Sequence, residues 1–280
     1  MRIGILSGQP GWHVQDLLRA AAELDIKATW LDISQLGSND NLHSYDALLI
    51  RSFPAGSFEQ TLFRLSLLYH AKRSGQRIIN SPASFEACID KYATTARLQS
   101  AGLPVPKTIC CQTIDSAMKA FQELGKDIVI KPLFGSEGKG IFRVTDEDAA
   151  WRAFSMLHQM GAVMYLQQYI EHGGYDLRVL VLDGQILGAI RRSHAYDWRT
   201  NLARGAKPDV VTLSPEDESL ALQATSCVGT IIAGVDILHF QCTHSSYLLE
   251  INGVPGWKGF TQATGIDVAT LLLKCIKNSL

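Results

Sequence analysis

The sequence lacks several features that would assign a function class at once. No apolar run among its 280 residues is long enough to span a bilayer. Lys and Arg total 26 against 27 Asp and Glu, so no bulk field attracts nucleic acid or an anionic membrane. The six cysteines form no C-x-x-C pair, which is typical of reduced, buried thiols. The first residues read as a strand and a turn rather than a signal peptide. These absences predict a soluble, cytoplasmic protein.

The common nucleotide-binding motifs are also missing. A Walker A loop needs Ser or Thr after Gly-Lys and a Gly six residues before that lysine, but Gly140 and Leu133 occupy those positions. The same stretch, residues 131–140, does not match G-x-G-x-x-G either, so a dinucleotide-binding loop is not indicated. The stretch is nevertheless rich in glycine and begins with Lys131. It therefore needs an interpretation outside the two standard motifs.

A glycine-rich turn beside a lysine can bind phosphate. Gly135, Gly138 and Gly140 allow tight turns and close approach of backbone N–H groups to an anion. Lys131, at the end of its predicted strand, would add a point charge. The alternative is a plain hairpin tip, which the turn alone does not exclude.

The first 88 residues alternate apolar and amphipathic segments. The pattern predicts strands at 3–6, 28–31, 47–50 and 77–79, with helices at about 14–24 and 58–74. This order indicates a small parallel sheet flanked by helices. Ligands of such sheets bind beyond the carboxyl ends of the strands. The loops 7–12 and 51–56 are therefore candidate substrate contacts, although each could equally be a simple connection.

The remaining residues combine hairpins with crossing helices, which predicts an α+β arrangement. Asp183-Gly184 joins two predicted strands and is a hairpin signal. Ser214-Pro215 is typical of a helix start. Strands are expected at 105–111, 127–133, 141–144, 162–170, 177–182 and 186–191, and helices at about 91–100, 114–124, 147–158 and 267–277, with a further helix starting at 214.

Two apolar strands near the C-terminus carry oxygen-bearing side chains. Glu250 and Asn252 leave the same face of one strand. If that strand pairs with 234–238 in a hairpin turning near Thr243, Asp236 lies opposite Glu250. Carboxylate and amide oxygens are ligands that suit Mg²⁺. The alternative is two ordinary strands with exposed polar faces.

Polar residues also follow the middle strands. Gln168, Tyr169 and Ile170 precede Gly173-Gly174, and an extended linker there could bind an adenine edge. Asp176 and Arg178 share one strand face. Several arginines lie at a strand end or in a long polar loop, and each could hold phosphate or carboxylate or be a surface charge: Arg191, Arg199 and Arg204.

The assembled pattern resembles the ATP-grasp ligases, most closely the RimK-type amino-acid (glutamate) ligases. The motifs that carry the resemblance occur in this order: Asp90-Lys91, Lys131 with the turn to Gly140, Gln168-Tyr169-Ile170, Asp176-Leu-Arg178, Trp198-Arg199-Thr-Asn201-Leu-Ala-Arg204, Gly-Val-Asp236 and Glu250-Ile-Asn252-Gly. The resemblance implies a fold that combines an α/β domain with an α+β domain. A Rossmann-like pre-ATP-grasp domain at 1–88 would precede a two-lobed ATP-grasp domain at 89–280. Lobe A would span about 89–168 and lobe B about 169–280.

The resemblance also implies which residues bind ATP. The residues expected to bind its phosphates are Lys91, Lys131 and the lid Gly135, Ser136, Glu137, Gly138 and Gly140. Gln168, Tyr169 and Ile170 match the adenine linker, where the family usually has Glu at the first position, and Asp176 matches a position near the ribose. Arg199, Asn201 and Arg204 match active-site positions, and Arg191 would hold the transferred group. Asp236, Glu250 and Asn252 match the Mg²⁺ ligands, which the hairpin argument also selects.

The implied activity is amide ligation. ATP would phosphorylate a substrate carboxylate, and an amine would attack the resulting acyl phosphate. The expected cofactors are ATP and Mg²⁺, with two ions and Mn²⁺ as a substitute. The partners would be a carboxylate and an amino-acid amine, with no nucleic acid or membrane, in a homo-oligomer. Glutamate is favoured because Arg51, Arg191, Arg192 and His194 could receive an acidic amino acid. Alternatives are an ATP-grasp kinase, a carboxylase-like enzyme or a non-catalytic nucleotide sensor.

Overall fold

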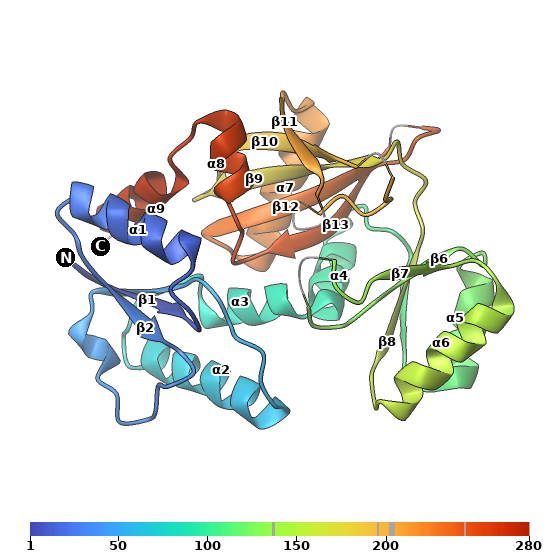
Figure 1. Ribbon diagram of the computed structural model, residues 1–280, viewed down its shortest axis with the longest axis horizontal. Helices are drawn as coiled ribbons and strands as arrows, with labels where there is room; N and C mark the ends of the chain where they lie inside the picture. Colours follow the sequence, from blue (N-terminus) through green and yellow to red (C-terminus); the bar gives the residue numbers. More distant parts are fainter. Residues whose placement is uncertain (136–137, 195, 202–204, 244, 280) are drawn as a thin grey trace.

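The described residues form three sheets in three regions (Figure 1). The computed structural model describes residues 1–280 except 136–137, 195, 202–204, 244 and 280. One sheet is parallel, with strand order β2-β1-β3-β4. The other two are antiparallel, with orders β5-β8-β6-β7 and β11-β10-β9-β12-β13. The predicted combination of α/β and α+β is confirmed.

The N-terminal region is built on the parallel sheet. The strand residues 3–7, 47–50 and 78–79 are buried because helices cover the sheet on both faces, whereas the edge strand at 27–32 is only partly buried. Ser57 and Gln60 form a capping box that starts the longest helix. The elements are β1 (Arg2–Ser7), α1 (Trp12–Glu23), β2 (Lys27–Asp32), η1 (Leu42–Ser44), β3 (Ala47–Ile50), α2 (Phe58–Arg73) and β4 (Ile78–Ile79).

Two helices connect this region to the rest of the chain. They are α3 (Pro82–Ile89), which the sequence analysis did not anticipate, and α4 (Lys91–Ser100). Helix α4 contacts α7 and β13 of the five-stranded sheet. Although α4 falls within the predicted lobe A, it therefore packs on lobe B, and the four-stranded antiparallel sheet begins only at β5. The domain bounds remain a prediction.

Lobe A is a four-stranded sheet with two helices on one face. Phe121 of α5 and Phe154 of α6 are fully buried against β6 and β8. In Figure 1 these helices lie at the outer edge of the molecule. The elements are β5 (Thr108–Cys111), α5 (Ile114–Glu123), β6 (Ile128–Lys131), β7 (Phe142–Val144), α6 (Glu147–Gln159) and β8 (Met164–Gln168).

Lobe B is the five-stranded sheet with α7 on one face. Its elements are β9 (Tyr175–Leu182), β10 (Gln185–Ser193), β11 (Lys207–Val211), α7 (Pro215–Val228), β12 (Ile232–His239) and β13 (Ser246–Asn252). Strand β11 corrects the sequence analysis, which predicts no strand between 191 and the helix that starts at 214. It contains Pro208 and lies at the sheet edge, where a missing N–H is tolerated.

The C-terminal helices return to the N-terminal region. Helices α8 (Lys258–Thr264) and α9 (Val268–Asn278) contribute to one core with α1, β1 and the inner face of lobe B. Leu272 and Leu273 of α9 pack in that core together with Leu17 of α1. Figure 1 shows the two chain ends close together beside these helices. The N-terminal sheet and lobe B therefore share a core, whereas lobe A has its own.

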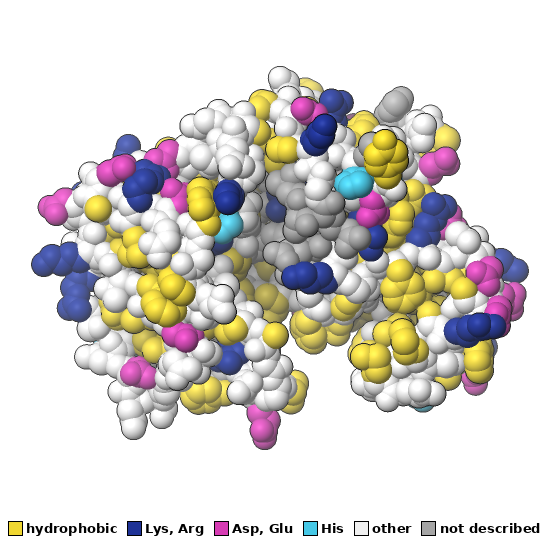
Figure 2. All heavy atoms as spheres, in the orientation of Figure 1, with side chains coloured by type: hydrophobic (Ala, Val, Ile, Leu, Met, Phe, Trp, Pro, Cys, Tyr) yellow, Lys and Arg dark blue, Asp and Glu magenta, His cyan; other side chains and the backbone are white. Residues whose placement is uncertain are grey.

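The surface is consistent with the balanced charge of the sequence. Figure 2 shows basic and acidic side chains interspersed over the visible face, without a field of one sign. Within the part of the chain that the structure describes, no helix is long and apolar enough to cross a membrane.

Candidate active site

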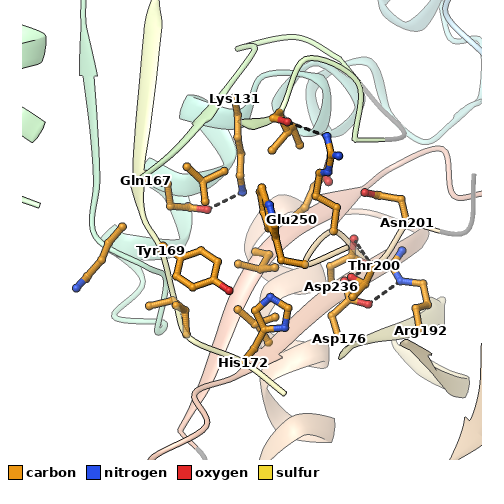
Figure 3. Close-up of a pocket in the computed structure, with 18 residues that line it drawn as sticks. Lys131, Gln167, Tyr169, His172, Asp176, Arg192, Thr200, Asn201, Asp236 and Glu250 are labelled. Atoms are coloured by element: carbon orange, nitrogen blue, oxygen red, sulfur yellow. Dashed lines mark hydrogen bonds and ion pairs between the residues drawn. The ribbon is translucent and has the colours of Figure 1, made fainter. Parts of the chain in front are cut away.

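A cavity between lobes A and B collects most of the described residues that the sequence singled out. Its wall is formed by β6 and β8 of lobe A, the linker after β8, the loop before β11, and β12 and β13 of lobe B (Figure 3). The predicted site residues that line it are Lys131, Gln168, Tyr169, Ile170, Asp176, Arg199, Asn201, Asp236 and Glu250.

One face of the lobe B sheet changes from apolar to polar along its length. Leu180, Ile190 and Ile232 of this face pack in the core shared with the N-terminal region. Farther along, Asp236 pairs with Arg178 on one side and with Glu250 on the other. Residues directly opposite in an antiparallel ladder project from the same face. The pairing of strands therefore brings these charged groups together at the cavity.

Four charged side chains form a buried network at the base of the cavity. Arg192 donates from Nε to Asp176 Oδ1 at 2.8 Å and lies 3.0 Å from Asp236 Oδ2 through Nη2. Arg178 donates from Nη2 to Asp236 Oδ2 at 2.8 Å. Asp176, Arg192 and Asp236 are each at most 4% exposed. Burial alone would raise the pKa of Asp236, but Arg178 and Arg192 hold this pKa below its usual value. Asp236 is thus a fixed carboxylate.

Glu250 and Asn252 extend this oxygen-rich surface. Glu250 lies 4.0 Å from Lys91 Nζ, and its side chain is 28% exposed. The amide Nδ2 of Asn252 is buried without a hydrogen-bond partner, and Asn252 is not among the residues that line the cavity. Within the described residues no three His, Cys, Asp or Glu side chains gather as a metal cluster, because the third member here is an amide.

This donor set fits Mg²⁺. Two carboxylates and an amide oxygen are hard ligands on adjacent strands. An ionised carboxylate has about four lone-pair sites, so the arginine bonds of Asp236 do not exhaust its capacity. Asp236, Glu250 and Asn252 remain the residues predicted to hold the ion.

Lys131 places a cation on the opposite wall. Its Nζ donates to Gln167 Oε1 at 2.6 Å, as Figure 3 shows. Gln167 is 2% exposed and was not anticipated; a glutamine at a buried strand position was the available signal. Burial lowers the pKa of Lys131 to about 8, an effect that Glu250 opposes and Lys91 reinforces. Lys131 is thus largely protonated at neutral pH and has no carboxylate partner among the described residues.

The adenine contacts of the linker between the lobes remain a prediction, and two of its three N–H groups are already bonded within the protein. The N–H groups of Gln168 and Tyr169 donate to Lys107 O at 2.8 Å and to Asp127 O at 3.0 Å. The Ile170 N–H has no acceptor among the described residues, so it is free to bind an edge. His172, which was not anticipated, also lines the cavity, and burial lowers its pKa.

Two further segments lie close to the cavity. Lys91 donates from Nζ to Gly135 O at 2.7 Å, which ties α4 to the glycine-rich turn between β6 and β7. Gly140 has φ +70°, and a Cβ there would lie 2.8 Å from Pro132 Cγ, so glycine is required. Gly138 has φ +68°. Arg199 donates from Nη1 to Ile141 O at 3.1 Å, across the lobes. Ser136, Glu137 and Arg204 lie outside the described residues.

A protein-family model described as a RimK-like ATP-grasp domain matches residues 88–276. The chain belongs to the RimK-like ATP-grasp family. It is 32% identical to the tetrahydromethanopterin:alpha-L-glutamate ligase of Methanosarcina acetivorans, covering 100% of this chain and 99% of that protein. It is 29% identical to the glutamate–LysW ligase ArgX of Sulfolobus acidocaldarius, covering 94% and 93%.

A solved structure agrees with the fold. The RimK domain ATP-grasp protein of Sphaerobacter thermophilus matches with a TM-score of 0.77 at 20% identity, over 99% of this chain and 100% of that one. The protein is thus an enzyme of the ATP-grasp ligase class. ATP with Mg²⁺ is the general requirement of ATP-grasp enzymes.

Within this ATP-grasp site, Arg191 does not have the predicted position. Its side chain is exposed, lies 3.6 Å from Asp209 on β11 and is absent from the cavity wall. A bulge between Ile186 and Gly188 is the physical reason. Without the bulge, Arg191 would lie opposite Asp176 on β9. With the bulge, Arg192 lies opposite Asp176. A shift by one residue exchanges the faces of a strand. Of these two neighbours, Arg192 is therefore the one that reaches the cavity.

Proposed function

We propose that the protein is an ATP-dependent carboxylate–amine ligase that adds an amino acid, with L-glutamate favoured, to a small-molecule, coenzyme or protein acceptor. The observation that carries this proposal is the joint placement of Lys131, Asp236 and Glu250 around one interlobe cavity. Cations on one wall and a metal-binding oxygen set on the other suit a nucleotide triphosphate. The curated relatives whose names specify glutamate support the choice of amino acid.

The proposed chemistry has two steps. A substrate carboxylate oxygen attacks the γ-phosphorus of ATP, the bond to the β-phosphate oxygen breaks, and ADP leaves an acyl phosphate behind. The amine nitrogen of the second substrate then attacks the acyl carbon. The carbon–oxygen bond to phosphate breaks, the nitrogen loses one proton, and an amide and inorganic phosphate result. No side chain has to act as a nucleophile.

The residues of this chain position and neutralise charge. Lys131 and Lys91 offset phosphate charge, and the Ile170 N–H receives the adenine edge. Asp236, Glu250 and Asn252 would hold Mg²⁺, proposed as two ions with Mn²⁺ as a substitute. The bound metal would offset the negative charge of the transferring phosphoryl group. Arg199 and the glycine-rich turn would exclude water, which otherwise hydrolyses an acyl phosphate.

The decisive experiment measures ADP release with a panel of amino acids, with and without candidate acceptors. L-glutamate should stimulate turnover more than L-lysine or L-alanine, and mass spectrometry should find the amide product. Hydroxylamine should trap the acyl phosphate as a hydroxamate when the amine is omitted. Equal responses to all amino acids would remove the preference for glutamate. Phosphorylated product that is stable to amines would indicate a kinase, and nucleotide binding without ADP release would indicate a sensor.

A further inference from the structure

Arg51 is a buried cation without an anionic partner. It follows β3 directly and is 6% exposed. Its guanidinium makes no hydrogen bond or ion pair with any described residue, and its Nε is sealed from solvent without an acceptor. The two Nη atoms are not sealed in this way. The open side of the guanidinium can therefore receive a ligand.

A rigid aromatic platform holds this guanidinium. The Arg51 Cζ lies 4.3 Å from the ring centre of Trp257, which is fully buried. Trp257 donates from its backbone N to His13 Nε2 at 3.0 Å and from Nε1 to Asp16 Oδ2 at 2.9 Å. Asp16 is also bound by Arg19 at 2.9 Å. The carboxylate of Asp16, on α1, thus binds Trp257 and Arg19 and does not pair with Arg51.

Arg51 keeps its charge at neutral pH, and His13 close to it is neutral. Burial lowers the pKa of Arg51 to about 9, so the group stays charged at neutral pH. Burial, followed by Arg51, lowers the pKa of His13 to about 4. Because His13 Nε2 accepts a hydrogen bond, the neutral ring carries its proton on Nδ1 and can donate from there. Attraction to one aromatic ring is weaker than the desolvation cost of an unpaired charge. The cluster is therefore incomplete without an anion.

The cluster lies where a substrate would be expected. Ser7 and Arg51 are at the carboxyl ends of β1 and β3, the end of a parallel sheet at which ligands bind. Trp257 follows Asn252 in the segment that leaves the metal-binding strand β13. Lys258, next in the chain, lies over Trp12 with 5.8 Å between its Nζ and the ring centre. A substrate at this cluster is thus adjacent in the chain to the proposed phosphoryl-transfer site.

We propose that Arg51, supported on Trp257, binds a carboxylate of the amino-acid substrate that does not take part in the reaction. This inference rests on the proposed function. L-glutamate carries two carboxylates, of which at most one can react, so an enzyme that uses it needs a site for the other. A guanidinium binds a carboxylate through two parallel hydrogen bonds, which also orients the substrate.

The test compares Arg51→Gln and Arg51→Lys with Arg64→Gln in the full chain. Arg64 is a matched control because it is also 6% exposed in the same region, but its Nη1 already donates to Pro54 O at 2.8 Å. Calorimetric titration with L-glutamate, without nucleotide, should show saturable binding to the wild type and to Arg64→Gln. Arg51→Gln should bind at least ~10-fold more weakly, with Arg51→Lys between them. Circular dichroism establishes that each variant is folded.

Several results would overturn the subsite. They are no saturable binding of L-glutamate to the wild type, equal binding by folded Arg51→Gln, or Arg51-dependent binding of inorganic phosphate tighter than that of L-glutamate. In turnover, the KM for L-glutamate should rise while the KM for ATP stays within about twofold. Amide formation with an unchanged KM in Arg51→Gln would reject only the subsite. Arg51-dependent glutamate binding without any amide product would reject only the ligase proposal.

Discussion

Asp236 and Glu250 lie directly opposite each other on β12 and β13, yet only Asp236 is bound by arginines. Asp236 is buried and held between Arg178 and Arg192, whereas Glu250 is part-exposed and has only Lys91 at 4.0 Å. The two carboxylates of this site thus differ in how firmly other side chains of the protein hold them. Asp236 is fixed in place before any ligand arrives, and Glu250 remains free to coordinate a cation.

Glu250→Gln should abolish most ATP turnover without unfolding the protein. The change removes one negative oxygen from the proposed Mg²⁺ set, and we expect a loss of turnover on the order of 100-fold or more. The measurement is ADP release at saturating Mg²⁺, with circular dichroism as the folding check. Glu123→Gln, at an exposed position of α5, is the control. Near-normal ADP release by a folded Glu250→Gln protein would contradict the metal role.

Nucleotide affinity should fall as the pH rises through 8. Burial lowers the pKa of Lys131 to about 8 in the free enzyme, and bound phosphates would raise it again. Binding should therefore take up a proton above pH 8, and ADP should bind up to about tenfold more weakly at pH 9 than at pH 7. Calorimetry in buffers of different ionisation enthalpy measures both quantities. Lys131→Gln should bind weakly at both pH values; if it retains the pH dependence of the wild type, another group is responsible.

Arg192 and its neighbour Arg191 should differ sharply in their effect on stability. Arg192→Leu leaves Asp176 buried without its arginine partner and Asp236 with Arg178 alone, which should cost about 3–5 kcal/mol of unfolding free energy. Arg191→Leu breaks an exposed pair with Asp209 and a cation–π contact with Tyr175, and it should cost about 1 kcal/mol. Urea unfolding at neutral pH measures both. Similar costs for the two variants would mean that the buried network is not what holds this face together.

His13 should make stability depend on mildly acidic pH. Its pKa is lowered from 6.5 to about 4 in the folded protein, so the unfolded chain binds the proton more readily between these values. Stability should therefore fall as the pH drops from 6.5 to 4, by ~1–2 kcal/mol after allowance for partial exposure. His13→Gln, whose amide oxygen can accept from the Trp257 N–H without titrating, should flatten this slope. An unchanged slope in urea unfolding would place the effect on another group.

Local pattern was sufficient for much of the fold and for the oxygen set. Alternation placed Glu250 and Asn252 on one face, and a turn near Thr243 placed Asp236 opposite Glu250, as the ladder confirms. A small parallel sheet followed by hairpins and crossing helices also agrees with the strand order. The period of two explains why Glu250 and Asn252 share a face. The position of Glu250 opposite Asp236 also depends on a bulge between Leu248 and Glu250, because without it the register at the turn would place Leu249 there.

Other features depended on information that no local pattern contains. One bulge in β10 decides that Arg192 rather than Arg191 enters the cavity, and nothing near Gly188 announces it. The arginine partners of Asp236 come from β9 and β10, so they require the strand order of the whole sheet. The apolar periodicity of 267–277 predicts a helix but not that it packs on α1. Roles for single residues therefore needed the tertiary structure.

The packing of α9 on α1 has a consequence for how the protein is made. The core that covers the first strands contains Leu272, Leu273 and Ile276, which leave the ribosome long after those strands. During synthesis the N-terminal sheet emerges with part of its apolar surface bare, and it stays so until α9 has emerged. A nascent chain stalled before this helix should be bound by chaperones or aggregate, whereas lobe A, whose core is its own, can fold as soon as β8 has emerged.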